Sequence, residues 1–248
     1  MEIVLLTSLG VGGATIIGAL IGFLIGKVKQ KFTDMILGFA AGVMLAAAIV
    51  GLIVPSIESG SVWITIIGVF VGAIILNLID RFMPHQHHTD DSCEECHPKS
   101  TKRYNKILLF VIAIAIHNLP EGIAAGVGFG SGNTASALTI AGGIALQNIP
   151  EGMVIIAPML AIGISKKKAL LIASLTGVVE IIGTILGYFA VSVSIAILPF
   201  ALAFAGGTML YIISDEMIPE THSHGNERLA TYAILVGFCL MLVVDFLI

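Results

Sequence analysis

Two similar hexapeptides hold the residues of this sequence that could bind a cation. The first reads His-Asn-Leu-Pro-Glu-Gly and begins at His117, and the second reads Gln-Asn-Ile-Pro-Glu-Gly and begins at Gln147. In each, the first and second residues lie four and three positions before the glutamate, so the three side chains share one helical face. Imidazole, amide and carboxylate groups on one face can ligate a divalent transition metal. The candidate ligands are His117, Asn118, Glu121, Gln147, Asn148 and Glu151.

Both hexapeptides lie near the middle of apolar stretches, as does a third acid, Glu180. A carboxylate at the centre of a bilayer costs about 2.5 to 3.5 kcal/mol on insertion scales, so three of them need compensation. A metal ion, or protons in its absence, would supply it. Met44 is expected at the same depth and could add a thioether. The alternative for Met44 is ordinary core filling.

Other interpretations of these residues stay open at this point. The polar groups could hydrogen-bond one another only to fix helix packing, or they could form a path for protons or monovalent cations. A metal-sensing receptor would bind the ion without translocating it. An intramembrane metalloprotease would need two fixed histidines and a general base, commonly His-Glu-x-x-His, and the sequence contains no such run. We therefore expect no enzyme activity.

The composition requires a membrane around these motifs. Of the 248 residues 57% are apolar and 11% charged, with a mean hydropathy of +1.03. No basic stripe points to nucleic acid as a partner. The apolar residues form blocks of about twenty, the length with which a helix crosses a bilayer core. We predict an all-α polytopic membrane protein, with one transmembrane domain over 1–248 and eight transmembrane helices at 3–26, 35–55, 61–80, 107–129, 134–161, 168–190, 194–218 and 229–247.

Basic residues indicate how these spans are oriented. All twelve Lys and Arg fall in the loops after the first, third, fifth and seventh spans. Because cytoplasmic loops retain positive charge, these loops should be cytoplasmic and both termini external. The first span has Glu2 before it and Lys27 after it, the reverse of a signal peptide, so it should remain in the mature protein.

The polar segment 83–106 is a predicted cytoplasmic loop with metal-binding side chains. Cys93 and Cys96 form a CxxC pair flanked by histidines, which suits zinc capture. With His97 the run also spells a c-type haem attachment signal, but haem is not ordinarily attached in the cytoplasm. A polar linker without metal is the remaining alternative. The candidate loop ligands are His85, His87, His88, Cys93, Cys96 and His97.

Further charged residues lie near both ends of a path through the membrane. Glu58 follows the second span on the external side, where it could attract cations or be an ordinary solvated acid. Carboxylates and imidazoles near the inner end of the seventh span could form a weak exit relay or a solvated helix end. They are Asp215, Glu216, Glu220, His222 and His224.

The paired hexapeptides, the eight spans with external termini and the His-rich loop resemble the ZIP (Zrt/Irt-like) family of divalent metal transporters, in its bacterial gufA-like branch. The resemblance covers essentially the whole chain. It implies Zn2+ transport across the bacterial inner (plasma) membrane into the cytoplasm, a central binuclear metal site, and two inverted three-helix repeats around helices four and five. Its site residues match His117, Asn118, Glu121, Gln147, Asn148, Glu151 and Glu180, with the thioether of Met44.

Two positions depart from many relatives. Gln147 stands where a histidine is common, and Asn148 stands where an aspartate occurs. One fewer anion weakens the case for a second metal held as tightly as the first. It also leaves the preferred metal open among Zn2+, Cd2+, Fe2+ and Mn2+. The expected partners are these ions and the lipid bilayer, and the sequence is compatible with a homodimer.

Overall fold

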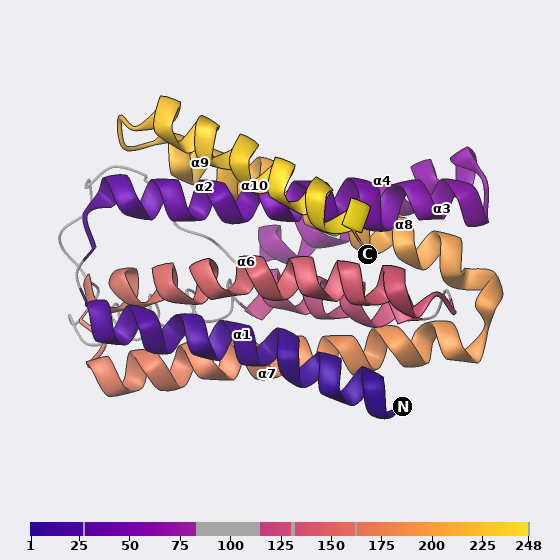
Figure 1. The fold of residues 1–248 in the computed structure, drawn as a ribbon, viewed down its shortest axis with the longest axis horizontal. Coiled ribbons are helices and arrows are strands. Elements are labelled where there is room, and N and C mark those ends of the chain that lie inside the picture. Colours follow the sequence, from indigo (N-terminus) through magenta and orange to yellow (C-terminus); the bar gives the residue numbers. More distant parts are fainter. Residues whose placement is uncertain (27, 83–114, 130–131, 162, 248) are drawn as a thin grey trace.

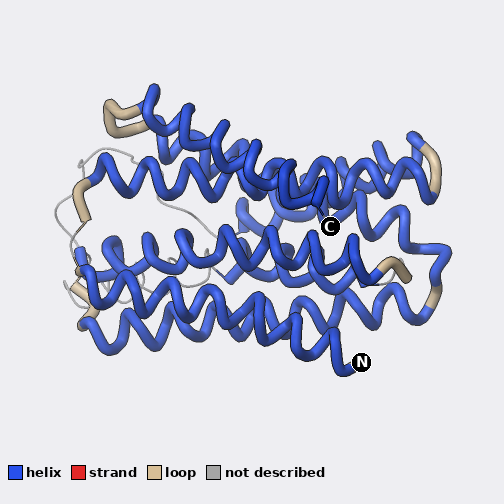
Figure 2. Tube along the Cα trace, viewed as in Figure 1, coloured by secondary structure: helices blue, strands red, loops and turns tan. Residues whose placement is uncertain are grey.

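The structure of the protein is a computed structural model that describes residues 1–26, 28–82, 115–129, 132–161 and 163–247. Within these ranges the chain is built of helices and short connections, without strands (Figures 1 and 2). Seven of the described helices are long and apolar enough to cross a membrane. The predicted span 107–129 lies partly outside the described residues, and its described part, 115–129, is helical. The predicted all-α polytopic membrane protein is confirmed.

The observed helices agree with the predicted spans, and the largest difference is at the second span, which begins at Gln30 rather than residue 35. The short 3-10 helix η2 precedes the seventh long helix, α8, which has Pro199 in its first turn. The bounds are α1 Glu2–Ile25, α2 Gln30–Ala46, α3 Val54–Ser59, α4 Val62–Phe82, α6 Thr134–Ala161, α7 Lys166–Val193, η2 Ile195–Ile197, α8 Leu198–Ile212, α9 Ile218–His222 and α10 Glu227–Leu247.

Two long helices are interrupted at matching places, and these interruptions were not predicted from the sequence. α2 passes into the π-helix η1 (Ala47–Ile53) before α3, and α8 passes into the π-helix η3 (Ile213–Met217) before α9. Each interruption ends where a proline, Pro55 or Pro219, enters the next helical turn. Because proline has no amide hydrogen for the carbonyl four residues earlier, the regular α-helical bonding fails there. The matching interruptions agree with the inverted repeats that the family resemblance implies.

The long helices form two groups, which lie one above the other in Figure 1. The α1 group consists of α1, α6, α7 and the helix 115–129, and α1 packs along both α6 and α7. The α2 group consists of α2, α4, α8 and α10, with α2 packed along α10 and α4 packed along α8. α2 also packs against α6, and this contact joins the two groups.

Glycines bring the helices within each group into backbone contact. A Cβ atom on Gly12 of α1 would lie 2.2 Å from the carbonyl oxygen of Gly177 on α7, so no larger residue fits there. A Cβ atom on Gly42 of α2 would lie 1.9 Å from a carbonyl oxygen of α10. Between the groups, Gly143 of α6 instead approaches a side chain, that of Met241. Backbone contacts therefore hold each group together, whereas side chains separate the groups at this point.

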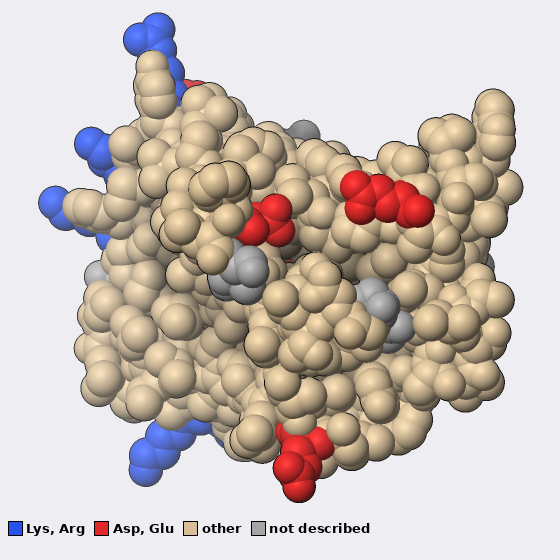
Figure 3. Space-filling model, turned by 45° about the vertical axis from the view of Figure 1, so that its right-hand side comes forward, with Lys and Arg blue, Asp and Glu red and all other residues tan. Residues whose placement is uncertain are grey.

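The distribution of polar and apolar side chains is the reverse of that in a soluble protein. Large apolar residues such as Leu6, Trp63 and Phe70 are exposed, whereas Glu121 and Glu180 are fully buried. Uncharged side chains cover most of the face in Figure 3. Lipid-facing apolar residues around a polar interior are what a polytopic membrane protein requires.

Lys and Arg side chains lie along one edge of the face in Figure 3, which corresponds to the end of the molecule in Figure 1 where α6 is followed by α7 and α2 begins. The start of α2, the start of α7 and the start of α10 contribute basic residues in the described chain. This arrangement agrees with the predicted placement of the basic loops on one side of the membrane.

Candidate metal centre

Both hexapeptides are helical through their prolines. The first lies in the helix 115–129 and the second in α6, and both are largely buried. Pro120 and Pro150 cannot donate to the carbonyls of residues 116 and 146, four positions earlier. Such backbone oxygens are tolerated inside a membrane where helices enclose a polar site. Each of these two facing helices therefore lacks one backbone hydrogen bond close to its candidate ligand side chains.

His117, Glu121 and Glu151 form a compact cluster. One ligand atom from each lies within 4.8 Å of the others, a geometry in which all three could hold one metal ion. Nε2 of His117 lies 3.4 Å from Oε1 of Glu151 and 3.9 Å from Oε1 of Glu121. Imidazole nitrogen and carboxylate oxygen suit zinc and other divalent transition metals. The structure thus brings together residues from both hexapeptides.

Gln147 orients one side of this cluster. Its Nε2 donates a hydrogen bond of 2.5 Å to Oε1 of Glu121, across the contact between α6 and the helix 115–129. Because an ionised carboxylate only accepts hydrogen bonds, the amide nitrogen must face Glu121. The amide oxygen of Gln147 is then left buried without a hydrogen-bond partner.

Glu180 on α7 anchors a second, adjacent network. Oε1 accepts hydrogen bonds from the amide of Asn118 and, at 2.6 Å, from the hydroxyl of Thr15 on α1. Oε2 accepts a hydrogen bond of 2.5 Å from Nδ2 of Asn148, which also lies 3.3 Å from the carbonyl oxygen of Val11. Residues from four helices therefore meet at one carboxylate. Nothing in the sequence marks Thr15, since threonine is common in membrane helices.

The buried atoms that lack a hydrogen-bond partner indicate which kind of ligand the site could bind. In the part of the chain that the structure describes, six buried side-chain atoms have no hydrogen-bond partner, and five of the six are oxygens. A buried polar atom without a partner is costly unless a ligand satisfies it. Oxygen acceptors beside an imidazole suit a cation, since an anion would be repelled. The atoms without a hydrogen-bond partner are Nε2 of His117, Oδ1 of Asn118, Oε2 of Glu121, Oε1 of Gln147, Oδ1 of Asn148 and Oε2 of Glu151.

Glu216 reaches this centre from the other group of helices. It lies in η3, and its Oε2 is 3.6 Å from Nδ1 of His117. Glu216 is one of the residues predicted at the exit, and its carboxylate lies beside the imidazole of His117 in the central cluster. Asp215, the preceding residue, is exposed.

Met44 is fully buried in α2 and belongs to the main apolar cluster, against which Ile116 and Leu146 pack. These two residues immediately precede His117 and Gln147 in the chain. The described contacts do not bring the Met44 sulfur to the ligand cluster, so its role as a ligand stays a prediction.

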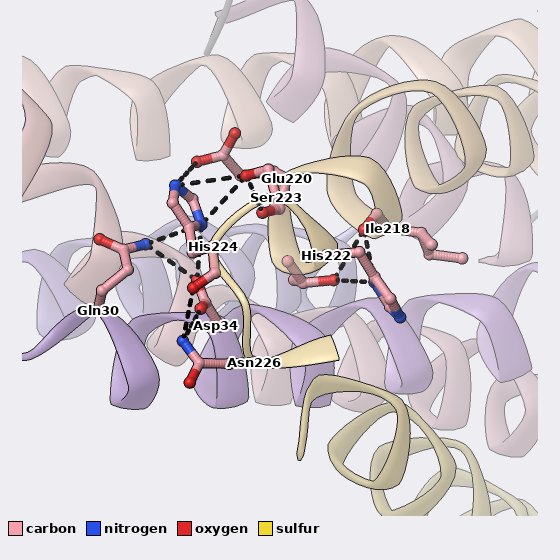
Figure 4. A network of polar contacts seen from close by, with 9 residues as sticks. Gln30, Asp34, Ile218, Glu220, His222, Ser223, His224 and Asn226 are labelled. Atoms are coloured by element: carbon pink, nitrogen blue, oxygen red, sulfur yellow. Dashed lines mark hydrogen bonds and ion pairs between the residues drawn. The ribbon is translucent and has the colours of Figure 1, made fainter. Parts of the chain in front are cut away.

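The remaining predicted exit residues form a separate network at the basic end (Figure 4). His224 lies 3.1 Å from Oδ1 of Asp34, a buried residue of α2, and 3.9 Å from Glu220 of α9. Asn226 and Gln30 donate to the same aspartate at 2.8 and 2.9 Å. This network ties the connection between α9 and α10 to the start of α2.

The other predicted residues lie apart from these networks. His222 bonds within its own helix end, with Nδ1 at 2.8 Å from the carbonyl oxygen of Ile218, and Nε2 lies 3.1 Å from Thr231. Glu58 is exposed in α3, away from the basic end. The loop candidates His85, His87, His88, Cys93, Cys96 and His97 lie outside the described residues.

Fold and site together define a multi-pass membrane protein with a buried cluster of side chains that could hold a metal ion. Sequence comparison agrees. The profile of the family described as ZIP Zinc transporter matches residues 84–245. Zinc transporter GufA of Myxococcus xanthus is 39% identical, with 97% of each chain covered. Zinc transporter ZupT of Chlorobaculum parvum is 37% identical over 94% of this chain and 92% of its own.

Zinc transporter ZIPB of Bordetella bronchiseptica is 33% identical over 94% of this chain and 77% of its own. These matches exceed what a shared fold alone would give, because they extend over nearly the whole sequence at substantial identity. The chain belongs to the ZIP family of metal transporters, as the hexapeptides indicated.

Proposed function

We propose that this protein carries Zn2+ across the bacterial inner membrane into the cytoplasm, through the centre formed by the two hexapeptides and Glu180. The observation that carries the proposal is the set of unpaired, buried oxygens around the imidazole of His117. The names of the relatives, which are zinc transporters, support Zn2+ as the cargo. Cd2+, Fe2+ and Mn2+ share enough ligand preferences to be further cargo.

The centre offers two adjacent cation positions. The first consists of His117, Glu121 and Glu151, whose ligand atoms already lie within reach of one ion. The second lies toward Glu180, where the carbonyl oxygens of the two hexapeptide asparagines are unpaired. Glu121 and Glu151 each have one unpaired oxygen and could be shared by both ions. With amides in place of a further acid, the second position should bind its ion more weakly.

Burial of charge explains why the centre needs a cation. Glu121 and Glu180 are fully buried and Glu151 nearly so. On insertion scales three central carboxylates cost roughly 7 to 10 kcal/mol. A divalent ion offsets that cost, and protons offset it when the metal has left. Exchange between metal and protons at one set of carboxylates is therefore a chemically reasonable cycle for carrying an ion through the bilayer.

The two groups of helices offer a way to expose this centre alternately to each side. The hexapeptides and Glu180 all lie in the α1 group, which is held together by backbone contacts such as that of Gly12 with Gly177. The α2 group contributes Glu216, next to His117. Movement of one group past the other would change which side reaches the centre. On the basic side, Glu216 and then Glu220 with His224 would receive the departing ion.

The decisive experiment is metal uptake into proteoliposomes that contain the purified full-length protein, with internal and external pH set separately. We expect protein-dependent Zn2+ accumulation, measured with a trapped zinc indicator. Binding of Zn2+ to the protein without accumulation would contradict transport and would favour a metal-sensing receptor. Accumulation of K+ or Na+ instead of Zn2+ would favour a monovalent-cation path.

A further inference from the structure

Thr15 in α1 is a fully buried residue whose hydroxyl forms a hydrogen bond with a side chain of another helix. It donates a hydrogen bond of 2.6 Å to Oε1 of Glu180 on α7. Other buried hydroxyls, such as those of Thr184 and Thr208, donate to a carbonyl of their own helix. Back-bonding of that kind is the ordinary way to satisfy a hydroxyl in an apolar helix. Thr15 instead directs its one donor to a carboxylate of the metal centre.

The backbone around Thr15 fixes where that hydroxyl lies. A Cβ atom on Gly152 of α6 would lie 2.3 Å from the carbonyl oxygen of Thr15 itself. One turn earlier, Gly12 makes the equally close approach to Gly177 of α7. α1 is thus in backbone contact with both neighbouring helices at this level. The hydrogen bond from Thr15 to Glu180 therefore joins two side chains whose backbones are held in place by helix packing.

Glu180 in turn sets the orientation of the two hexapeptide asparagines. Nδ2 of Asn148 donates to Oε2, and the amide of Asn118 donates to Oε1, the oxygen that Thr15 also contacts. Because the carboxylate accepts hydrogen bonds, both amide nitrogens face it and both amide oxygens must face elsewhere. Those two oxygens are buried and unpaired, which points to a cation as their partner.

We propose that Thr15 is a positioning residue of the metal centre. By holding the Glu180 carboxylate, it orients the two asparagine oxygens toward the second cation position. Thr15 does not touch the ion and acts through Glu180. This inference rests on the proposed function, since the second position is part of the proposed centre. Hydrogen-bond partners of metal ligands typically change metal affinity about 10- to 100-fold when they are removed.

The test compares Thr15→Val, which keeps the shape and removes the donor, with Thr15→Ser, which keeps the hydroxyl. Purified full-length protein in detergent is dialysed against Zn2+ and, separately, Cd2+, and bound metal per chain is measured by elemental analysis. Thr208→Val is the matched control, because it removes a buried hydroxyl that bonds its own helix. We expect Thr15→Val to weaken the second bound ion about tenfold or more and to leave the first unchanged. Thr15→Ser and Thr208→Val should behave as wild type.

Several results would overturn the assignment. One is a Thr15→Val protein that binds both ions as the wild type does. Another is a Thr15→Ser protein as impaired as Thr15→Val, which would indicate packing and not hydrogen bonding. Binding of a single ion by the wild type would remove the second position altogether. If Thr15→Val does not insert, Thr15→Ala replaces it, with the same expectations.

Zinc uptake by the wild type in proteoliposomes is measured in parallel and separates this inference from the proposed function. Absent uptake together with the expected loss of the second ion in Thr15→Val would reject transport and retain the role of Thr15. Normal uptake together with unchanged binding in Thr15→Val would retain transport and reject the role of Thr15. A variant that lowers only the apparent zinc affinity, with the maximal rate kept, further supports positioning.

Discussion

Nδ1 of His117 lies 3.6 Å from Oε2 of Glu216, although the two residues belong to different groups of helices. The side chain of His117 is 11% exposed and that of Glu216 is 37% exposed. The pair therefore connects the buried centre with a more open region of the protein. Glu216 also lies in the π-helix η3, where the backbone departs from regular α-helical bonding. In the proposed function, an ion that leaves His117 on this side would meet the carboxylate of Glu216 first.

Glu216→Gln should slow zinc transport without abolishing zinc binding. The amide keeps the size of the side chain but removes the negative charge that would receive the departing ion. We expect the initial rate of uptake to fall about tenfold, which corresponds to about 1.4 kcal/mol on the barrier. Equilibrium zinc binding in detergent should stay at the wild-type level.

Glu227→Gln is the control for this prediction, because Glu227 is an exposed acid at the start of α10 on the same side. It should transport zinc as the wild type does. A Glu216→Gln protein with wild-type uptake would show that the contact with His117 is not on the path of the ion.

The all-helical fold and the residues that the structure brings together from the two hexapeptides could be predicted from the sequence, because both depend on local patterns. Apolar blocks of membrane-spanning length mark the helices, and the three- and four-residue spacing puts His117, Asn118 and Glu121 on one face. The antiparallel arrangement of consecutive spans then faces one hexapeptide with the other. These steps need only the chain order and the helical period.

Contacts between distant helices could not be predicted in the same way. Thr15 and Asp34 have no signal in the sequence, because a lone threonine in an apolar helix and an acid beside a polar loop are both common. Their roles depend on crossing points such as Gly12 with Gly177, and many glycines could serve as such points. Glu216 was identified by residue type near a helix end, and its approach to His117 depends on how the two groups pack.

Asp34→Ala should destabilise the protein. Asp34 is 1% exposed and accepts hydrogen bonds from Gln30 and Asn226, with His224 at 3.1 Å. Its loss leaves these donors without their acceptor at the junction of α2 with the α9–α10 connection (Figure 4). We expect a loss of about 1 to 3 kcal/mol in unfolding free energy, seen as a lower thermal transition in detergent.

For this prediction Glu227→Ala is the matched control, since it removes an exposed acid from the same end of the molecule. Its thermal transition should equal that of the wild type. Equal transitions for Asp34→Ala and Glu227→Ala would mean that the network in Figure 4 adds no net stability.

Cys93 and Cys96 should be labelled by a membrane-impermeant thiol reagent only after cells are broken open. The predicted orientation places their loop in the cytoplasm, on the side of the basic residues. Cys239 of α10 is free and exposed, so the experiment is done in a Cys239→Ser background. Labelling is followed by a mass shift on gels, and labelling in intact cells would reverse the orientation.

Gln147→His should shift the preference among metals and preserve transport. Gln147 donates to Glu121 through Nε2 and leaves its oxygen unpaired. A histidine could keep the donated hydrogen bond with one ring nitrogen and offer the other to the ion. That nitrogen is a softer ligand than an amide oxygen, so Zn2+ and Cd2+ should gain relative to Mn2+. Uptake of the three metals is measured at matched expression, and an unchanged ranking would remove Gln147 from the ligand set.

Glu121→Gln and Glu151→Gln should each abolish most zinc transport while the protein still inserts. Each substitution keeps the size of the side chain and an oxygen atom, but it removes one anion from the three residues that could hold a metal ion. Loss of a partner outside the ligand set already costs about 10- to 100-fold, so loss of a charged ligand should cost at least about 100-fold in uptake. Removal of a buried charge also relieves its burial cost, so the metal-free variants should be at least as stable as the wild type. Zinc uptake and the thermal transition are measured on the same preparations, with Glu227→Gln as control, and full zinc flux in Glu121→Gln would exclude the central site as the path of the ion.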